Sequence, residues 1–206
     1  MRILFIADLH VCSNTNVIKD IMQREKYDLI ISLGDNTEYD LNNIMLYNTK
    51  SVPIYGVLGN HDLYHVFSHF PSITNLHYKK TEYKGLSFIG IEGCMMYKEA
   101  NVPMYTDDQV SRLVKTMPPS DVLVSHTGPS GLMDKDNDDI SRRGFFSFND
   151  YYKTAKPKYH FFGHYHKNEH HTVYHGWNLT ECYCIFGISL FDTETNTMTK
   201  LFSEEE

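Results

Sequence analysis

RILFIADLH, residues 2–10, is the stretch of sequence that decides the fold class. Residues 2–7 form a mostly apolar run of strand length, rich in Ile, Leu and Phe. Near-continuous apolarity indicates a strand with both faces buried, as in the middle of a layered α/β domain. The run ends at Asp8, and His10 follows two residues later. Because sites in α/β proteins form at the carboxyl ends of strands, this stretch predicts a central strand and the start of a site.

The same pattern recurs four times downstream. The runs and their endings are YDLIISL (27–33) before Gly34-Asp35, VPIYGVL (52–58) before Gly59-Asn60-His61-Asp62, DVLVS (121–125) before His126, and YHFF (159–162) before Gly163-His164-Tyr165-His166. Their length and their content of Ile, Val, Leu and Phe predict strands. Each predicted strand therefore delivers metal-binding residue types at its carboxyl end.

Helical patterns separate several of these runs. Helices are expected over residues 16–26, 40–48, 107–117 and 149–155. The clearest is 107–117, because Thr106 can cap it, acids occupy its first turn and Pro118 ends it. Residues 86–92 and 183–201, the latter broken by a turn at 193–196, are interpreted as strands of a second sheet.

Length and composition narrow the class of protein. The chain has 206 residues, enough for one domain with a full core, so a single domain over residues 1–206 is expected. A net charge of -7 gives no support for extended nucleic-acid binding or for docking on acidic lipid. The four cysteines form no C-x-x-C pair, and reduced thiols are expected. No signal peptide or bilayer-length apolar segment is present, so we expect a cytoplasmic protein without a membrane partner.

The polar residues at the strand ends form a candidate ligand set. It consists of two carboxylates, one amide and four imidazoles: Asp8, Asp35, Asn60, His10, His126, His164 and His166. Asp8 and His10 would share one face of an extended segment, as would His164 and His166. The set has no thiolate, which argues against a closed structural zinc site. It also exceeds the needs of one ion, so a pair of borderline divalent ions is expected. A lone histidine at a strand end is more often an ordinary polar residue, so the hypothesis depends on the joint pattern.

The order of these motifs resembles that of the calcineurin-like metallophosphoesterases. Their pattern is D-x-H, G-D, G-N-H-D or G-N-H-E, a lone His, and G-H-x-H. The corresponding segments here are Asp8 to His10, Gly34-Asp35, Gly59 to Asp62, His126 and Gly163 to His166. Any one short motif is common by chance, but five in order are specific. The resemblance implies an α/β fold in which a two-sheet β-sandwich is flanked by helices, the α-β-β-α metallophosphoesterase architecture.

The resemblance also implies a role for each residue. Asp8, His10 and His166 would hold one metal, Asn60, His126 and His164 the other, and Asp35 would bridge both. Mn²⁺ is favoured as the cofactor, and Fe, Co, Ni and Zn also suit these ligands. Hydroxide bridging the metals would attack phosphorus. His61 would protonate the leaving oxygen, and Asp62 would hydrogen-bond to His61 and raise its pKa.

The substrate class is open at this stage. Serine/threonine protein phosphatases carry arginines after G-D and inside G-N-H-E; here Asn36 follows Asp35, and Asp62 stands in place of Glu. Residues 125–134 (SHTGPSGLMD) resemble a segment of small phosphodiesterases in the family. Hydrolysis of a small phosphodiester, of the nucleotide or cyclic-nucleotide class, is therefore favoured. The alternatives are a phosphomonoesterase, a nuclease acting on single-stranded or damaged DNA, and a non-catalytic metal-binding scaffold.

Residues 134–143 (DKDNDDISRR) are the one long charged stretch. A solvated loop is the simpler interpretation. The alternative is a charged active-site loop in which Arg142 or Arg143 reaches a phosphate oxygen. The sequence predicts no other substrate-binding residue, and it does not predict the oligomeric state.

Overall fold

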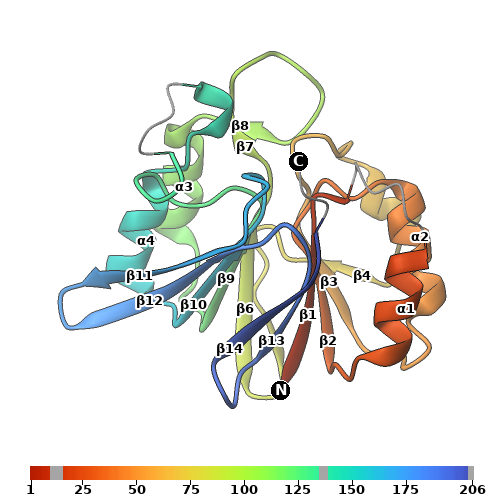
Figure 1. The fold of residues 1–206 in the computed structure, drawn as a ribbon. Coiled ribbons are helices and arrows are strands. Elements are labelled where there is room, and N and C mark those ends of the chain that lie inside the picture. Colours follow the sequence, from red (N-terminus) through yellow and green to blue (C-terminus); the bar gives the residue numbers. More distant parts are fainter. Residues whose placement is uncertain (10–15, 135–138, 204–206) are drawn as a thin grey trace.

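The computed structural model describes residues 1–9, 16–134 and 139–203. Two six-stranded sheets pack face to face, and helices cover their outer faces (Figure 1). The first sheet has the order β14-β13-β1-β2-β3-β4. Its strands are β1 (Arg2–Ala7), β2 (Leu29–Ser32), β3 (Ile54–Gly56), β4 (Ile73–Asn75), β13 (Gly187–Asp192) and β14 (Thr197–Phe202). β1 to β4 run parallel, whereas β13 pairs with β1 in the antiparallel direction.

The second sheet has the order β11-β12-β10-β9-β6-β5. Its strands are β5 (Thr81–Tyr83), β6 (Leu86–Ile91), β9 (Val122–Ser125), β10 (Tyr159–Phe162), β11 (Glu169–His175) and β12 (Asn178–Cys184). β6, β9, β10 and β12 are parallel, and β11 closes a hairpin on β12. A separate short pair joins β7 (Cys94–Met95) to β8 (Met104–Tyr105).

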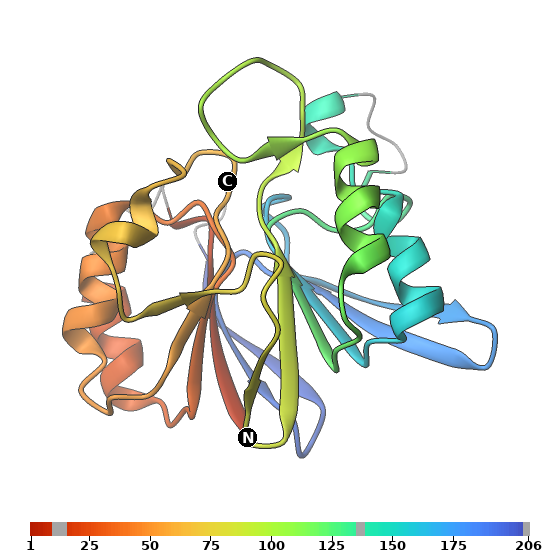
Figure 2. The same cartoon turned by 180° about the vertical axis from the view of Figure 1, so that it is seen from behind.

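The helices form the outer layers. They are α1 (Asn16–Arg24), α2 (Glu38–Tyr47), α3 (Asp107–Thr116) and α4 (Ser147–Ala155), with the 3-10 turns η2 (Val66–His69) and η3 (Ile140–Arg142). The expected cap is confirmed at α3, where the Thr106 side chain accepts from the Gln109 amide. Apolar residues of α1 and α2 pack with outer residues of β1 and β2, and those of α3 and α4 pack with β6, β9 and β10. Figure 2 shows the two helix pairs on opposite sides of the sandwich.

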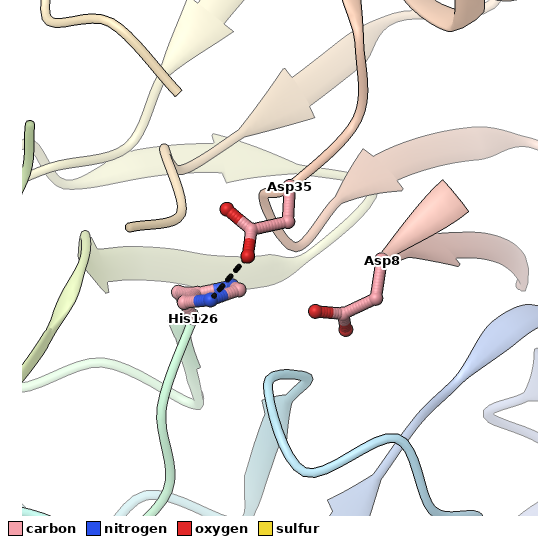
Figure 3. A group of neighbouring side chains, drawn as sticks. All are labelled: Asp8, Asp35 and His126. Carbon is pink, nitrogen blue, oxygen red and sulfur yellow. Dashed lines mark ion pairs between the residues drawn. The ribbon is translucent and has the colours of Figure 1, made fainter. Parts of the chain in front are cut away.

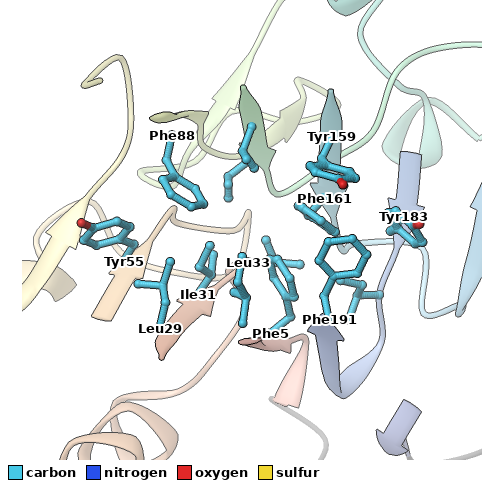
Figure 4. Close-up of a cluster of buried hydrophobic side chains, with 14 of the residues drawn as sticks. Phe5, Leu29, Ile31, Leu33, Tyr55, Phe88, Tyr159, Phe161, Tyr183 and Phe191 are labelled. Carbon is cyan, nitrogen blue, oxygen red and sulfur yellow. The ribbon is translucent and has the colours of Figure 1, made fainter. Parts of the chain in front are cut away.

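The main core lies between the sheets. Phe5 and Ile31 from the first sheet meet Phe88 and Phe161 from the second, and all four are fully buried (Figure 4). The rings of Phe5 and Phe161 lie 4.3 Å apart at their centroids. Because alternate residues of β1 point to opposite faces, Leu4 and Ile6 pack under the helices instead. The apolar run of β1 is explained by burial on both faces.

The expected two-sheet sandwich flanked by helices is confirmed, but one strand assignment was wrong. The 183–201 stretch was interpreted as part of a second sheet, yet β13 and β14 extend the first sheet beside β1. Residues 183 and 184 instead end β12, and the β11–β12 hairpin was not predicted. The reason is that local apolar pattern identifies a strand but not its pairing partner.

Three of the four cysteines lie in the described part of the chain. Cys94, Cys182 and Cys184 are buried free thiols, and Cys12 lies outside the described residues. Within the described ranges, no helix has both the length and the apolar character that a bilayer span requires.

Candidate metal centre

The parallel strands bring their carboxyl ends to one edge of the sandwich. Asp8 follows β1 directly, and Asp35 comes three residues after the end of β2. His126 follows β9 directly, on the second sheet. The three side chains are buried, and their ligand atoms all lie within 4.8 Å of one another (Figure 3). Residues distant in sequence and drawn from both sheets thus meet at one point.

His126 is oriented by a main-chain contact behind it. Its Nδ1 donates to the Leu33 carbonyl oxygen at 2.8 Å. Its Nε2 therefore points toward two oxygens, Asn60 Oδ1 at 3.0 Å and Asp35 Oδ2 at 3.3 Å. A histidine that donates one ring N–H to a carbonyl presents the other nitrogen as a ligand. The geometry fits a cation held between Asn60, Asp35 and His126.

Asp8 supplies a second observation that fits a cation. Its Oδ2 accepts from the His164 amide at 2.9 Å. Its Oδ1 is buried and has no hydrogen-bond partner among residues 1–9, 16–134 and 139–203. His166 Nε2 lies 3.8 Å from that oxygen. Since a buried carboxylate oxygen without a partner is costly, this oxygen is suited to coordinate a metal.

His164 is held from two directions by η3. Its Nε2 lies 2.6 Å from the Ser141 carbonyl oxygen, which makes Nε2 the donor. Its own carbonyl oxygen accepts from Arg142 Nη1 at 2.6 Å. The ring leaves Nδ1 for coordination and lies 5.0 Å from the His126 ring. The stretch 134–143 thus contacts the centre through Ser141 and Arg142, although residues 135–138 lie outside the described part of the chain.

The G-N-H-D loop is tied to Asp35 through the main chain. Asp62 Oδ2 accepts from the amides of Asp35 at 2.9 Å and Gly59 at 2.7 Å. The His61 amide donates to Asp35 Oδ1 at 2.8 Å. The expected side-chain bond between His61 and Asp62 stays a prediction. The contacts that the structure gives Asp62 instead hold Asp35 and Asn60 next to each other.

Burial and mutual charge shift the pKa values of this cluster. Burial and the Asp35 carboxylate raise the pKa of Asp8 to about 7 and that of Asp62 to about 6. Burial would also raise the pKa of Asp35, but the ion pair with His126 lowers it below its ordinary value. Burial disfavours charge on His126, yet Asp35 outweighs it and raises the pKa of that ring to about 9. Burial lowers the pKa of His164 to about 3. The buried Asp8 and Asp35 and the half-buried Asp62 therefore bring three carboxyl groups together around one protonatable ring, that of His126, which makes the centre attractive to divalent ions.

The backbone of the centre differs from the extended form that we expected. Asp8, Asp35, His164 and His166 have positive φ angles of 55°, 51°, 73° and 52°. Left-handed residues other than glycine are uncommon and cluster at functional sites. The premise that His164 and His166 form an extended pair was therefore wrong, since turns aim these two side chains and that of Asp8. Whether Asp8 and His10 share a face stays a prediction, because His10 lies outside the described residues.

The last candidate ligand is His10, and the second sheet carries further histidines. His10 lies outside the described residues, so its role stays a prediction. His170 and His171 lie on β11 and contact Glu181 at 2.7 Å and Glu169 at 3.0 Å. His160 is fully buried in the second sheet. Sequence reasoning missed the carbonyls of Leu33 and Ser141, because a main-chain acceptor leaves no signal in residue type.

Comparison with known proteins identifies the family of this chain and proteins of similar fold. The profile of the family described as calcineurin-like phosphoesterase matches residues 1–168. No curated protein matches the sequence. The structure resembles TT1561 of Thermus thermophilus, with a TM-score of 0.65, 14% identity and 96% of each chain covered. It also resembles phosphopantetheinyl hydrolase PptH of Mycobacterium tuberculosis, with a TM-score of 0.60, 13% identity and 89% of each chain covered.

A larger relative has the same core fold. Purple acid phosphatase PPD1 from yellow lupin has a TM-score of 0.55 and 13% identity, over 90% of this chain and 43% of that chain. At these identities the structural likeness shows the fold alone. The profile covers most of the chain, including all five motifs, and the chain belongs to the calcineurin-like phosphoesterase family, whose members use divalent metals.

Proposed function

We propose that this chain is a hydrolase of phosphodiesters of the nucleotide class that works with two divalent metal ions. The observation that carries the proposal is the buried group of Asp8, Asp35 and His126, with their ligand atoms within 4.8 Å of one another. The family supports metal-dependent phosphoester hydrolysis in general. The preference for diesters and for Mn²⁺ is part of the proposal.

The proposed ligand sets follow the family resemblance, and the grouping of Asp8, Asp35 and His126 supports them. Asn60, His126 and His164 would hold one ion, Asp8, His166 and His10 the other, and Asp35 would contact both. Asp35 suits a bridging position because Oδ2 faces His126 at 3.3 Å while burial keeps the carboxylate out of water. When bound, the two ions would act as Lewis acids on the phosphate and lower the pKa of a coordinated water toward neutrality.

The chain's own groups have separate tasks in this proposal. His61 is exposed beside Asp35, and it would hold the proton that the leaving oxygen takes. Asp62 would keep the Asp35 and Gly59 amides in place through the two bonds to its Oδ2. Ser141 would orient His164 through its carbonyl oxygen.

The position after Asp35 supports a diester over a protein phosphomonoester. Asn36 is buried, and its amide nitrogen donates to Ser32 Oγ at 2.9 Å and to the Ile6 carbonyl at 3.3 Å. Its oxygen accepts from the Leu9 amide at 3.3 Å. A side chain used in this way braces the strand ends. It does not supply the cation that protein phosphatases of the family place after G-D to grip a dianionic phosphate.

The test is a matrix of metals against substrates. Mn²⁺, Ni²⁺, Co²⁺, Zn²⁺ and Mg²⁺ are each combined with a phosphomonoester, a diester, a cyclic nucleotide and single-stranded DNA. We expect the highest kcat/KM for a small diester with Mn²⁺. Faster turnover of the monoester or of DNA would replace the diesterase assignment with a phosphatase or a nuclease. Metal binding without turnover of any ester would favour the scaffold alternative.

The matched variant is Asp35→Asn, which keeps the shape of the side chain and removes its charge. We expect it to lose at least one bound metal and most of the activity. The control Asp150→Asn removes an exposed carboxylate paired with Lys153 and should behave like the parent. Full metal occupancy in Asp35→Asn would remove Asp35 from the ligand set.

A further inference from the structure

A cavity outside the metal centre lies between Tyr64 and the β7–β8 segment. Its volume is about 300 Å³, and its lining includes Tyr64, Met96, Lys98, Met104, Tyr105 and Gln109. This volume is at the small end of ligand pockets, which run from about 300 to 1,000 Å³. It suits one ring system and is too small for a length of polymer.

One aromatic wall of the cavity is rigid. Tyr105 donates its hydroxyl to Glu92 Oε1 at 2.7 Å. The Tyr105 ring also stacks on His77, with centroids 5.8 Å apart and planes 15° from parallel. Glu92 is buried, so this anchor is held inside the protein. The Tyr105 ring is thus held at its hydroxyl and on one face. A ring held in this way is preorganised to pack against another flat group.

Two other lining residues, Tyr64 and Met96, are open to solvent. Tyr64 is 45% exposed and Met96 is 37% exposed, although both carry large apolar surfaces. An aromatic face and a polarisable thioether are the partners on which a planar heterocycle packs. Their exposure around a cavity indicates a ligand surface more than a structural one.

Polar groups at the cavity can hydrogen-bond to the edge of such a heterocycle. Gln109 Oε1 already accepts from the Thr106 amide at 2.8 Å, which leaves the Gln109 NH₂ group as a donor. Lys98 and Glu99, both exposed, add a cationic donor and an anionic acceptor to the lining. A few convergent polar groups in an otherwise aromatic and Met-lined cavity are the usual composition of a small-ligand site.

The cavity belongs to the same edge of the molecule as the metal centre. Tyr64 comes two residues after Asp62 in the G-N-H-D loop. The Gly93 amide, just before β7, donates to the Leu58 carbonyl at 2.7 Å, and the Thr127 amide donates to the Gly93 carbonyl at 3.3 Å. The segment that forms the cavity is therefore pinned between the loops that carry Asn60 and His126. Figure 1 shows the β7–β8 loop above these strand ends.

We infer that this cavity is a subsite for the nucleobase of the substrate, with the base packed against Tyr64, Tyr105 and Met96. The inference rests on the proposed function, because it needs the ester phosphate to occupy the neighbouring metal centre. Stacking on aromatic faces tolerates every base, so the subsite selects nucleotides over simple esters without selecting one base.

The first test compares two esters with the same leaving group. One is the p-nitrophenyl ester of thymidine 5′-phosphate, and the other is methyl p-nitrophenyl phosphate. We expect Tyr64→Ala to lower kcat/KM about tenfold for the thymidine ester, the effect of one lost stacking contact, and to leave the methyl ester unchanged. The control Tyr174→Ala removes a 76% exposed tyrosine on β11 and should change neither rate. Equal losses on both esters would overturn the subsite.

The second test needs no metal and no hydrolysis. Adenosine is titrated into protein labelled at the methionine methyl groups, with Met96→Leu used to assign one signal. We expect the Met96 and Met104 signals to shift in a saturable way, and the shift of Met104 to weaken in Tyr64→Ala. Saturable shifts in a protein that hydrolyses no ester would retain the subsite and reject the proposed function. Turnover of the thymidine ester without any methionine shift would retain the proposed function and reject the subsite.

Discussion

At the scale of single residues, Asp35 shows how tightly the centre is assembled. Its φ angle of 51° lies in the left-handed region, and its carboxylate is buried. Oδ1 accepts from the His61 amide while Oδ2 faces His126. Each oxygen thus has a different task, and a small displacement of the residue disturbs both.

Gly59→Ala tests this packing. A Cβ at residue 59 would overlap Asp35 Oδ1 and lie 2.5 Å from the Asp35 amide nitrogen, and backbone cannot yield as a flexible side chain can. We expect the carboxylate to be pushed aside, Mn²⁺ affinity measured by calorimetry to fall at least about tenfold, and stability to fall by about 1–3 kcal/mol. Gly85→Ala is the control for metal affinity: nothing lies within 4 Å of the added Cβ, but the φ angle of 81° strains an alanine, so we expect a loss of stability there without a loss of Mn²⁺ affinity. Unchanged affinity in Gly59→Ala would mean that the loop can relax around the methyl group.

His61→Ala tests the proposed acid. The side chain can be removed without a metal ligand being lost, since His61 contacts Asp35 through its main-chain amide. We expect metal content to stay at the parental level and kcat to fall about 10²–10⁴-fold for esters with poor leaving groups, but much less for p-nitrophenyl esters. Equal rates for variant and parent on a poor leaving group would refute the acid role.

At the scale of elements, the centre depends on segments that carry no ligand. η3 contributes the Ser141 carbonyl to the His164 ring and the Arg142 guanidinium to the His164 carbonyl. Behind His126, the β9 residue Ser125 contacts His160 Nε2 at 2.6 Å, and Tyr152 of α4 contacts His160 Nδ1 at 2.5 Å. These contacts hold the backbone next to the candidate ligands His126 and His164 in place.

Arg142→Ala tests the contact from η3. Loss of the guanidinium frees the His164 carbonyl, so of the two contacts from η3 the one between Ser141 and the His164 ring remains. Partners behind a metal ligand typically change affinity about 10–100-fold, and we expect the weaker of two Mn²⁺ binding steps to fall into that range. Arg142→Lys should recover part of the loss. Arg143→Ala, at an exposed neighbour, is the control, and an equal effect there would assign the change to charge alone.

His160 gives the second sheet a defined pH dependence. Burial lowers the pKa of the folded ring to about 3 from 6.5, so the unfolded chain binds a proton there that the folded protein does not. The neutral His160 ring therefore contributes to the free energy of unfolding. This contribution is complete above pH 6.5 and is lost as the pH falls toward 3, by about 1.4 kcal/mol per pH unit. Denaturant unfolding of the parent and of His160→Gln from about pH 7 to about pH 4 measures it, a range that lies between the two pKa values. We expect the free energy of unfolding to fall less steeply with decreasing pH in the variant. Parallel curves of this free energy against pH for variant and parent would contradict a buried neutral ring.

At the scale of the whole molecule, the candidate ligands come from both sheets. Asp8 and Asp35 follow strands of the first sheet, whereas His126 follows a strand of the second. A bound ion would therefore connect the two halves of the sandwich at one edge, where the buried Asp8 and Asp35 and the half-buried Asp62 otherwise repel one another. Metal binding is expected to stabilise the entire fold and not only the loops.

Thermal unfolding measures this connection. Mn²⁺ at about 100 times its Kd adds about 2.7 kcal/mol to the folded state by mass action, which corresponds to a Tm increase of about 5–10 °C for a chain of this size. A chelator should reverse the increase. Asp35→Asn should show little of it, and an equal Tm increase in that variant would place the binding elsewhere.

Much of the fold could be predicted from local pattern. The expected bounds of β1 and β10 agree with the structure, and α3 begins at Asp107 as its capping residue indicates. The role of the Asp134–Arg143 stretch was harder to predict from sequence, because a charged run has no periodicity that distinguishes a solvated loop from one that packs on a site. The contact between Arg142 and His164 joins residues 22 positions apart and became visible only in the folded chain.

The sequence by itself determined the strands, the motif order and the residue types of the centre, because these depend on local burial and on the chemistry of single side chains. Only the tertiary structure decided which sheet β13 and β14 join, how Asp8 and His164 turn, and which nitrogen of His126 faces Asp35. Those features depend on main-chain partners distant in sequence, such as the Leu33 and Ser141 carbonyls, and main-chain atoms are the same in every residue.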